Sequence, residues 1–357
     1  MKKAELSLRD IDILFTPYSH RKLKLRTRLV MAPLPRLFSQ NGVPTPEMLH
    51  YYQRRARNMV GLIITEPVAV NDPSAAADSG MAHFYGGAAL RAWRQICRAV
   101  HACACGIVPQ LNHVGMLRPA NGDMPHPEAP AVGPSGIDPI SGEKRGEEMS
   151  RGRISSVIAS FATAARSACV LGFDGVEING GSGSLVEQFL RKETNKRHDE
   201  YGGDIMRRAR FACQVVQSVR KVVGRHFPVI FRFSQSGGDI WDTPLLASPA
   251  ELEELLQMLC ESGVDFFACD GADRPAFPGS ALPLAGWVRV LADRPVIING
   301  GIGLPGAGCT GDLALHWADL VAVGRALLAD AEWGTKVHMG RDHDIIPFTQ
   351  RAWMHLF

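Results

Sequence analysis

The sequence predicts an α/β protein: a (β/α)8 TIM barrel with an N-terminal β-hairpin and long βα loops, forming a single domain over residues 1–357. Three observations support this fold class. Short apolar runs alternate with longer segments of helical periodicity along most of the chain. Glycine-rich or polar loops follow several of the apolar runs, where barrel enzymes build their sites. The length of 357 residues suits one barrel of about 250 residues with insertions.

The N-terminal elements come first in the chain. Residues 11–26 contain two short alternating runs around Ser19–Lys22, which predict a hairpin that caps the N-terminal mouth of the barrel. The first barrel strand is expected at Leu29–Met31. A helix is expected at Pro46–Arg57, because a threonine precedes a proline at its first position.

The later elements follow in alternation. Strands are expected at Leu62–Thr65, Ile107–Leu111, Asp174–Ile178, Val229–Phe233, Phe266–Cys269, Pro295–Ile298 and Leu320–Val323. Helices are expected at about Ala88–Ala104, Ile154–Leu171, Arg207–Val223 and Pro249–Ser262. Residues 117–153 are rich in Pro and Gly and predict a long loop, either a functional cover or a surface insertion without a role. Residues 332–357 form a C-terminal tail.

Composition narrows the functional classes. A formal net charge of +3 is too small to indicate nucleic-acid or membrane partners. The eight cysteines lack zinc-type spacing, so free thiols and no metal site are expected. No stretch approaches about 18 continuous apolar residues, and the N-terminus has no apolar run long enough for a signal peptide. A cytoplasmic protein is therefore expected.

The stretch Gly172–Gly203 organises the functional prediction. It ends in TNKRHDEYGG, and Arg208, Arg210 and Phe211 follow. With these residues the chain resembles the old yellow enzyme family of FMN-dependent ene-reductases, whose signature is TNxRxDxYGG followed by RxRF. The resemblance covers about Ile11 to Arg351 and is greatest to the barrel of the enoate and dienoyl-CoA reductase branch. It implies FMN as cofactor, NAD(P)H as a possible reductant, a small-molecule substrate and a possible homo-oligomer.

Larger members of that branch continue from the barrel into iron–sulfur ligands, with a cysteine after a proline. Here Phe348 follows Pro347, and no cysteine occurs after Cys309. Thiolates are needed to hold such a cluster, so none is expected.

Several flavin contacts are implied by the resemblance. The backbone of Pro33 and Leu34 would lie against the ring. Pro35 stands where the family usually has a Thr or Cys that tunes the flavin, and Pro67 stands where it often has a Gly or Ala. Proline has no backbone N–H, so one tuning contact is absent. Gln110, at the end of the third strand, would read the polar edge of the pyrimidine ring.

The remaining flavin contacts come from the second half of the barrel. Arg232 lies inside an apolar strand and needs an anionic or strongly polar partner. The resemblance implies the N1–C2=O edge of the flavin, and a salt bridge inside the barrel is the alternative. The loops after strands seven and eight are expected to hold the FMN phosphate through Gly300, Gly301, Gly324 and Arg325.

The catalytic positions depart from the family. Asn179, Ser182 and Ser184 stand where it has a His, a His or Asn, and a Tyr. Neither of the first two can be cationic, and the hydroxyl of Ser184 is too short and too weakly acidic to replace a phenol. Losing one electrophilic donor costs on the order of 10²–10³ in rate, so ordinary enone reduction should be impaired.

Either the substrate brings its own activation or the acid comes from elsewhere in the chain. His113, Tyr85 and Asp270 are candidates, and a packing role is the alternative for His113.

Three functions remain open. The first is an FMN-dependent oxidoreductase of the ene-reductase type that acts on a specialised conjugated carbonyl-type substrate. The second is a flavin-dependent double-bond isomerase or desaturase in a biosynthetic pathway. The third is a non-catalytic flavin-binding protein, which the joint presence of Gln110, Arg232 and the glycines after strands seven and eight argues against.

Overall fold

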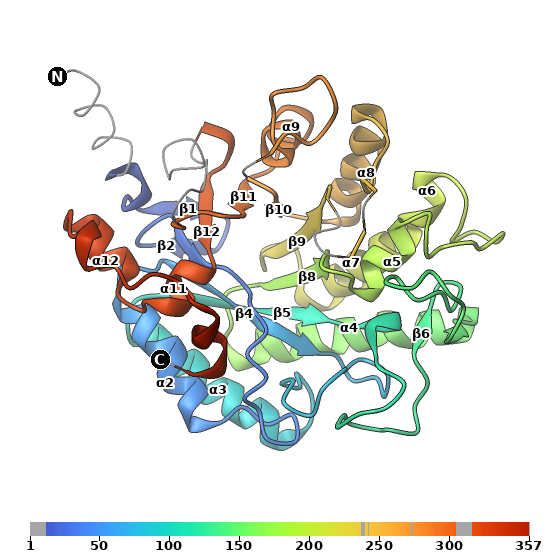
Figure 1. Ribbon diagram of the computed structural model, residues 1–357, viewed down its shortest axis with the longest axis horizontal. Helices are drawn as coiled ribbons and strands as arrows, with labels where there is room; N and C mark the ends of the chain where they lie inside the picture. The colour runs from blue at the N-terminus through green and yellow to red at the C-terminus, as the bar shows by residue number, and fades with distance from the viewer. Residues whose placement is uncertain (1–11, 237–239, 242, 273, 305–315, 357) are drawn as a thin grey trace.

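Eight parallel strands close into a barrel (Figure 1). The computed structural model describes residues 12–236, 240–241, 243–272, 274–304 and 316–356. The barrel strands are β3 (Leu29–Met31), β4 (Leu62–Ala69), β5 (Gly106–Asn112), β8 (Val176–Gly180), β9 (Val229–Ser234), β10 (Phe266–Asp270), β11 (Val296–Asn299) and β12 (Leu320–Val323). The ring closes because β12 pairs with β3 and β9 with β10, which confirms the predicted (β/α)8 barrel.

Helices surround the barrel between the strands (Figure 1). They are α2 (Pro46–Arg57), α3 (Gly87–His101), α4 (Arg151–Leu171), α5 (Leu185–Leu190), α6 (Ile205–Arg208), α7 (Arg210–Val223), α8 (Pro249–Ser262), α9 (Leu284–Leu291), α11 (Arg325–Ala329) and α12 (Trp333–His338). Short 3-10 helices occur at η1 (Gly115–Leu117), η2 (Asp342–Asp344) and η3 (Gln350–Met354).

The alternation of side chains along each strand divides the core into two parts. Inward-facing residues form one apolar cluster, made of Val30, Ala32, Leu62, Ile64, Val108, Ile230, Phe266, Ala268, Ile297, Leu320 and Ala322. Outward-facing strand residues, such as Val176 and Ile178, pack with the helices in a larger cluster. The barrel interior is therefore filled at its N-terminal end.

The predicted hairpin is present as β1 (Tyr18–His20) and β2 (Leu23–Leu25), paired antiparallel. Leu23 and Leu25 are buried in the interior cluster of the barrel. Leu25 also lies close to Gly106, the first residue of β5. A Cβ atom built on Gly106 would be 3.3 Å from the Leu25 side chain. The hairpin therefore packs on the interior cluster beside the start of β5.

Several expected boundaries were wrong. Strand β4 was expected to end at Thr65 but continues to Ala69, with a shift of register between Ile64 and Pro67 that lets the ladder pass the proline. Helix α4 begins at Arg151, three residues before the expected start, because the Ser150 hydroxyl accepts a hydrogen bond from the Arg153 N–H.

Helix α4 is, among the described helices, the one long and apolar enough to cross a membrane by length and composition, with a mean hydropathy of 1.5. In the structure it packs on β5, α3 and α7 as part of the outer layer of the barrel. Its buried residues, including Val157 and Phe161, belong to the outer core cluster. Its apolar composition is therefore explained by its packing as a helix of the barrel.

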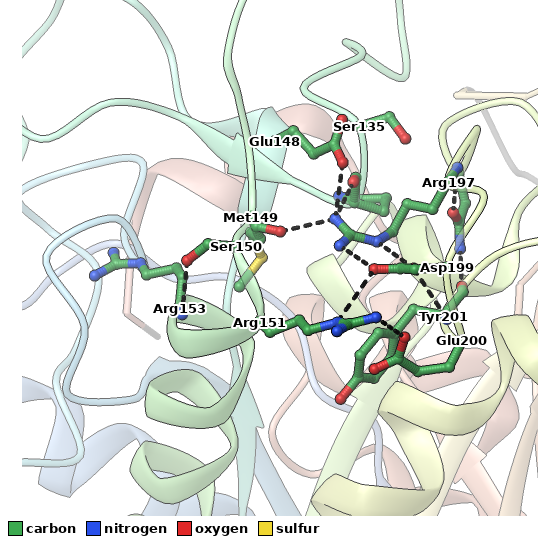
Figure 2. A network of polar contacts seen from close by, with 12 residues as sticks. Ser135, Glu148, Met149, Ser150, Arg151, Arg153, Arg197, Asp199, Glu200 and Tyr201 are labelled. Carbon is green, nitrogen blue, oxygen red and sulfur yellow. Dashed lines mark hydrogen bonds and ion pairs between the residues drawn. The ribbon is translucent and has the colours of Figure 1, made fainter.

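The long loop at residues 117–153 contains two short strands, β6 (Val132–Gly133) and β7 (Glu147–Glu148), which were not expected. Figure 2 shows how Arg197 of the TNKRHDEYGG segment holds this loop. Its guanidinium donates to the carbonyl oxygens of Pro134 (2.8 Å) and Met149 (2.7 Å) and pairs with Glu148 (3.3 Å). The same guanidinium pairs with Asp199 at 2.6 Å, so the signature segment fixes the base of the loop.

The C-terminal tail lies beside α2 (Figure 1), where Arg54 donates to the carbonyl oxygen of Leu356. Arg36, in the loop after β3, donates to the carbonyl oxygens of Ala352 and His355 at 3.3 and 2.5 Å. Its guanidinium also lies over the ring of Trp353, at 5.8 Å. The tail therefore packs against the loop that follows the first barrel strand.

Candidate active site

The inward-facing side chains change from apolar to polar toward the carboxyl ends of the strands. On β9 the inward series runs from Ile230 to Arg232, and on β10 it runs from Ala268 to Asp270. Counting in steps of two along the other strands shows that the inward-facing polar residues also include Gln110 on β5, Glu177 and Asn179 on β8, and Asn299 on β11. Gln110, Glu177, Asn179 and Arg232 are all less than a tenth exposed. A buried polar layer thus lies at the barrel edge where active sites are built.

Two hydrogen-bonded groups make up this polar layer. The amide Nε2 of Gln110 donates to Glu177 Oε1 at 2.7 Å. Arg232 Nη2 lies 2.9 Å from Asp270 Oδ1, and the amide of Asn299 donates to the same oxygen at 2.7 Å. The salt bridge considered as the alternative for Arg232 is therefore present.

Two buried atoms of the layer have no hydrogen-bond partner within the part of the chain that the structure describes. They are Arg232 Nε, a donor, and Glu177 Oε2, an acceptor. A buried polar atom without a partner costs about 1–3 kcal/mol, so such atoms indicate a place where a ligand can bind.

Burial raises the pKa of Glu177 to about 7. The nearby charge of Arg232 and the hydrogen bond from Gln110 lower this pKa, while the charge of Asp270 raises it. The carboxyl group of Glu177 therefore changes its charge near neutral pH.

A cavity of ≈ 230 Å³ lies beside the polar layer. It is lined by Pro35, Leu37, Glu66, Pro67, Ala77, Asp78, Met81, Asn112, Val114, Leu117, Asn179, Ser182 and Ser184. The structure therefore brings together the three predicted catalytic residues of the β8 loop and the two prolines predicted to lie near the flavin.

The amide of Asn179 is held in place by its neighbours. Its Nδ2 donates to Asn112 Oδ1 at 3.0 Å, and its Oδ1 accepts from the Gly181 N–H at 3.1 Å. Ser182 is exposed and has a φ of 52°. Ser184 is 2% exposed and caps helix α5, with its Oγ accepting from the Glu187 N–H. Asn179 and Ser182 therefore still have N–H or O–H groups that can donate to a substrate, whereas the Ser184 hydroxyl is hydrogen-bonded to the backbone.

Glu66 is a cavity residue that was not predicted. It is 2% exposed, and its Oε1 accepts a hydrogen bond from the Tyr52 hydroxyl at 3.2 Å. Its Oε2 accepts from the Arg36 N–H at 3.4 Å, which ties β4 to the loop after β3. Burial outweighs these hydrogen bonds and raises the pKa of Glu66 to about 7. The cavity thus contains a carboxyl group that can exchange a proton near neutral pH.

The three residues predicted as alternative acids lie outside the described lining of this cavity. His113 is 1% exposed, with Nε2 at 3.2 Å from Asp72 and Nδ1 accepting from the Gly115 N–H at 3.0 Å. Tyr85 stacks on His83 with ring centroids 4.5 Å apart. Asp270 pairs with Arg232 and lines a second cavity of ≈ 370 Å³. The backbone of His113 lies beside the predicted catalytic trio, because its carbonyl oxygen accepts from the Leu185 N–H at 2.8 Å, but its side chain is turned to Asp72 and is not in the described lining.

The residues predicted to hold the ring and the phosphate lie at the same barrel edge. Pro33 and Leu34 lie in the loop after β3, separated from its end by one residue. A Cβ atom built on Gly324 would be 3.5 Å from the Leu34 side chain. Gly300 and Gly301 follow β11 with φ values of 128° and 67°, which favour glycine.

Gly324 and Arg325 follow β12. Arg325 is exposed, and its guanidinium lies 5.9 Å from the ring of Phe348. Gly300 and Gly324 therefore follow the ends of two paired strands.

The two unpredicted carboxyl groups, Glu66 and Glu177, had a signal in the sequence. Each is a charged residue within or at the end of an apolar strand, as Arg232 is. The rule applied to Arg232, that a buried charge needs a partner, applies equally to them.

Comparison with known proteins agrees with this arrangement. The sequence profile of the NADH:flavin oxidoreductase / NADH oxidase family matches residues 13–344. An old yellow enzyme homologue from Zymomonas mobilis superposes with a TM-score of 0.79 at 25% identity, covering 95% of this chain and 96% of that one. The predicted resemblance to the old yellow enzyme family is thereby confirmed.

Two curated relatives are similar over most of this chain. A "Metal reductase" from Desulforamulus reducens is 33% identical over 94% of this chain. An "NADH oxidase" from Thermoanaerobacter brockii is 31% identical over 90% of it. The matched region is 50% of each relative, so this chain spans about half of their length.

Proposed function

Because the chain belongs to the NADH:flavin oxidoreductase / NADH oxidase family, we propose that it is an FMN-dependent oxidoreductase of the ene-reductase type. Its substrate is a small molecule with a C=C bond conjugated to a carbonyl-type group, and NAD(P)H is its reductant. The observation that carries this proposal is the polar layer at the carboxyl ends of the strands, in which Arg232 Nε and Glu177 Oε2 are buried without partners among the described residues.

The donor set of this layer fits a flavin. The pyrimidine edge of the ring alternates hydrogen-bond acceptors with an N–H donor, so it needs both kinds of group from the protein. Gln110 supplies an amide with both, and Arg232 supplies a free N–H and a positive charge. Gly300, Gly301, Gly324 and Arg325 would hold the phosphate where β11 and β12 end.

The chemistry that the flavin supplies when bound is hydride transfer between nicotinamide and substrate. Arg232 would stabilise negative charge at the N1–C2=O edge, and its ion pair with Asp270 would limit how much positive charge it presents. Asn179 and Ser182 line the cavity and can donate hydrogen bonds to the substrate oxygen. Both are neutral, so the substrate must itself be strongly activated.

Proton transfer falls to Glu66, which is, with Asp78, one of two carboxyl side chains in the described lining of the cavity. Glu66 lines the cavity, and its pKa of about 7 gives it both protonation states near neutral pH. It is the residue that we infer exchanges a proton with the substrate, in place of the phenol found in the family. Pocket volumes for whole ligands run from about 300 to 1,000 Å³, so the ≈ 230 Å³ cavity suits the reacting end of the substrate.

Anaerobic stopped flow on the purified protein tests the proposal. A yellow protein that is bleached by NADH or NADPH and reoxidised by an enone supports it. A protein that cannot be reconstituted with FMN contradicts it. The matched variant is Glu66→Gln, which should slow reoxidation by the enone but leave bleaching by nicotinamide unchanged.

A second candidate, a flavin-dependent double-bond isomerase or desaturase, is favoured by one observation. The described cavity lining has no His or Tyr, whereas it has a carboxyl group with a pKa of about 7 that suits reversible proton transfer. This function predicts turnover of a conjugated compound without bleaching by nicotinamide. The same stopped-flow experiment therefore distinguishes the two.

A further inference from the structure

The carboxylate of Glu177 lies against the amide of Gln110, below the proposed flavin site. The two residues are register partners on β8 and β5, and they are 0% and 2% exposed. The Nε2–Oε1 distance of 2.7 Å is that of a strong hydrogen bond to a charged acceptor. Glu177 also precedes Asn179 by two residues, so both side chains face the barrel interior.

An ionised carboxylate can only accept hydrogen bonds, and this fixes the orientation of the Gln110 amide. One hydrogen of Nε2 must face Glu177, because the reversed amide would bring its carbonyl oxygen against an anionic oxygen. The amide carbonyl and the second N–H are then left for a ligand. Their order is set by Glu177 and not by the ligand.

Charged groups on β9 and β10 act on the carboxyl group of Glu177. Arg232 on β9 favours the ionised form of Glu177, and Asp270 on β10 opposes it. Gln110 on β5 is neutral and donates to the carboxyl. Glu177 Oε2 has no hydrogen-bond partner in the described residues, so the carboxylate retains an acceptor near Arg232.

We propose that Glu177 is a positioning residue for the flavin: through Gln110 it decides which end of the amide meets the imide edge of the ring, and its charge offsets that of Arg232. The imide edge has an N–H flanked by carbonyl oxygens, so an amide pairs with it well only in one orientation. This inference rests on the proposed function.

The test is the variant Glu177→Gln, which keeps the shape and removes both the charge and the preference for one amide orientation. FMN affinity, measured by quenching of flavin fluorescence, should fall about tenfold. The midpoint potential of the bound flavin should rise by about 30 mV, a tenfold change in the equilibrium constant of a two-electron couple. An unchanged affinity and potential in a folded variant would overturn the inference alone, whereas a wild-type protein that does not bind FMN would overturn the proposed function as well.

The variant Gln110→Met provides a control that separates positioning of the amide from a merely structural role of Glu177. If Glu177 acts through the amide, the affinity effect of Glu177→Gln should disappear in the Gln110→Met background. Additive losses of FMN affinity in the double variant would contradict this.

The wild-type protein offers a second test if Glu177→Gln does not fold. A protonated Glu177 can donate to the amide carbonyl and so permits the reversed orientation of Gln110. Riboflavin affinity should therefore fall as the pH is lowered through about 7. Riboflavin is the probe because it lacks the phosphate of FMN, which titrates at about pH 6. A riboflavin Kd that is constant from about pH 6 to 8 would overturn the inference.

Discussion

Ser184 Oγ lies 2.8 Å from the carbonyl oxygen of Asn179 and donates a hydrogen bond to it. Ser184 Oγ also caps helix α5, because it accepts a hydrogen bond from the Glu187 N–H. The side chain that stands in place of the family's phenol therefore joins the end of β8 to the start of α5. Its position is determined by the backbone and not by a substrate.

Replacing Ser184 by Ala should destabilise the protein. The variant loses a cap and a buried hydrogen bond, so the free energy of unfolding should fall by about 1–2 kcal/mol. Urea denaturation followed by circular dichroism measures this. Ser156→Ala is the control, because that exposed hydroxyl bonds only within its own helix, and its effect should stay below about 0.5 kcal/mol. Equal effects of the two substitutions would contradict the capping role.

Restoring the family's substrate-binding pair should raise enone reduction. Asn179→His with Ser182→Asn provides the missing electrophilic donors at the cavity and leaves the Ser184 cap intact. We expect the rate of flavin reoxidation by 2-cyclohexenone to rise by about 10²-fold. Adding Ser184→Tyr should raise it further but lower the melting temperature, because the replaced side chain is 2% exposed. An unchanged rate in all these variants would mean that the lost trio does not limit the reaction.

The Arg232–Asp270 pair should set the flavin potential. Asp270→Asn removes the negative partner 2.9 Å from the guanidinium, so more positive charge acts on the reduced flavin. The midpoint potential should rise by about 30 mV, which spectroelectrochemical titration can measure. Asp293→Asn, at an exposed position, is the charge-matched control and should leave it unchanged. A lowered potential in Asp270→Asn would refute the argument.

Much of the fold could be predicted from the sequence because strand and helix periodicity are local properties. The strands at Leu29–Met31 and Leu320–Val323 were predicted with the bounds observed. The extension of β4 could not be predicted, because it depends on pairing of Pro67 with Gln110 across a shift of register. The start of α4 was missed because its cap, Ser150, precedes two arginines and a glycine that hide the apolar periodicity.

The candidate site was predicted less completely, because its contacts join residues that are far apart in the sequence. Gln110 and Arg232 stood out as polar residues at or within apolar strands. Their partners, Glu177 and Asp270, are 67 and 38 positions away, so only the closed barrel shows the pairs. Ser184 lies at the expected cavity, but its capping role depends on a helix as short as Leu185–Leu190, which the sequence pattern does not reveal.

The contacts of Arg197 (Figure 2) should hold the long loop in place. Arg197→Met leaves Asp199 and the carbonyl oxygens of Pro134 and Met149 without their donor. Arg197 is 5% exposed and Asp199 22%, so the pair is only partly buried, and losing its charged hydrogen bonds costs about 1–3 kcal/mol. We expect that loss in the free energy of unfolding, with faster amide hydrogen exchange in residues 117–153. Arg207→Met, at an exposed position, is the control, and equal exchange rates in the two variants would refute this role for Arg197.

The ion pair between His101 and Asp174 should make stability depend on pH at the alkaline side. Their Nε2–Oδ2 distance is 2.8 Å, and the hydrogen bond to Asp174, with that to Cys97, raises the pKa of His101 from 6.5 to about 10. A group whose pKa is raised on folding stabilises the protein fully below its unfolded pKa, and this stabilisation is lost as the pH rises through the folded pKa. The contribution is therefore complete below about pH 6.5 and lost by about pH 10.

Both side chains of this pair are about a third exposed, so solvent reduces the size of the effect but not its sign. The measurement is the melting temperature of the wild type and of His101→Gln across this pH range. The wild type should be the more stable at neutral pH, and the difference should shrink toward about pH 10. His343→Gln is the control, because His343 is 80% exposed and its removal should change the melting temperature less than that of His101. A difference between wild type and His101→Gln that grows with pH would show that the neutral imidazole, and not the ion pair, stabilises this end of α3.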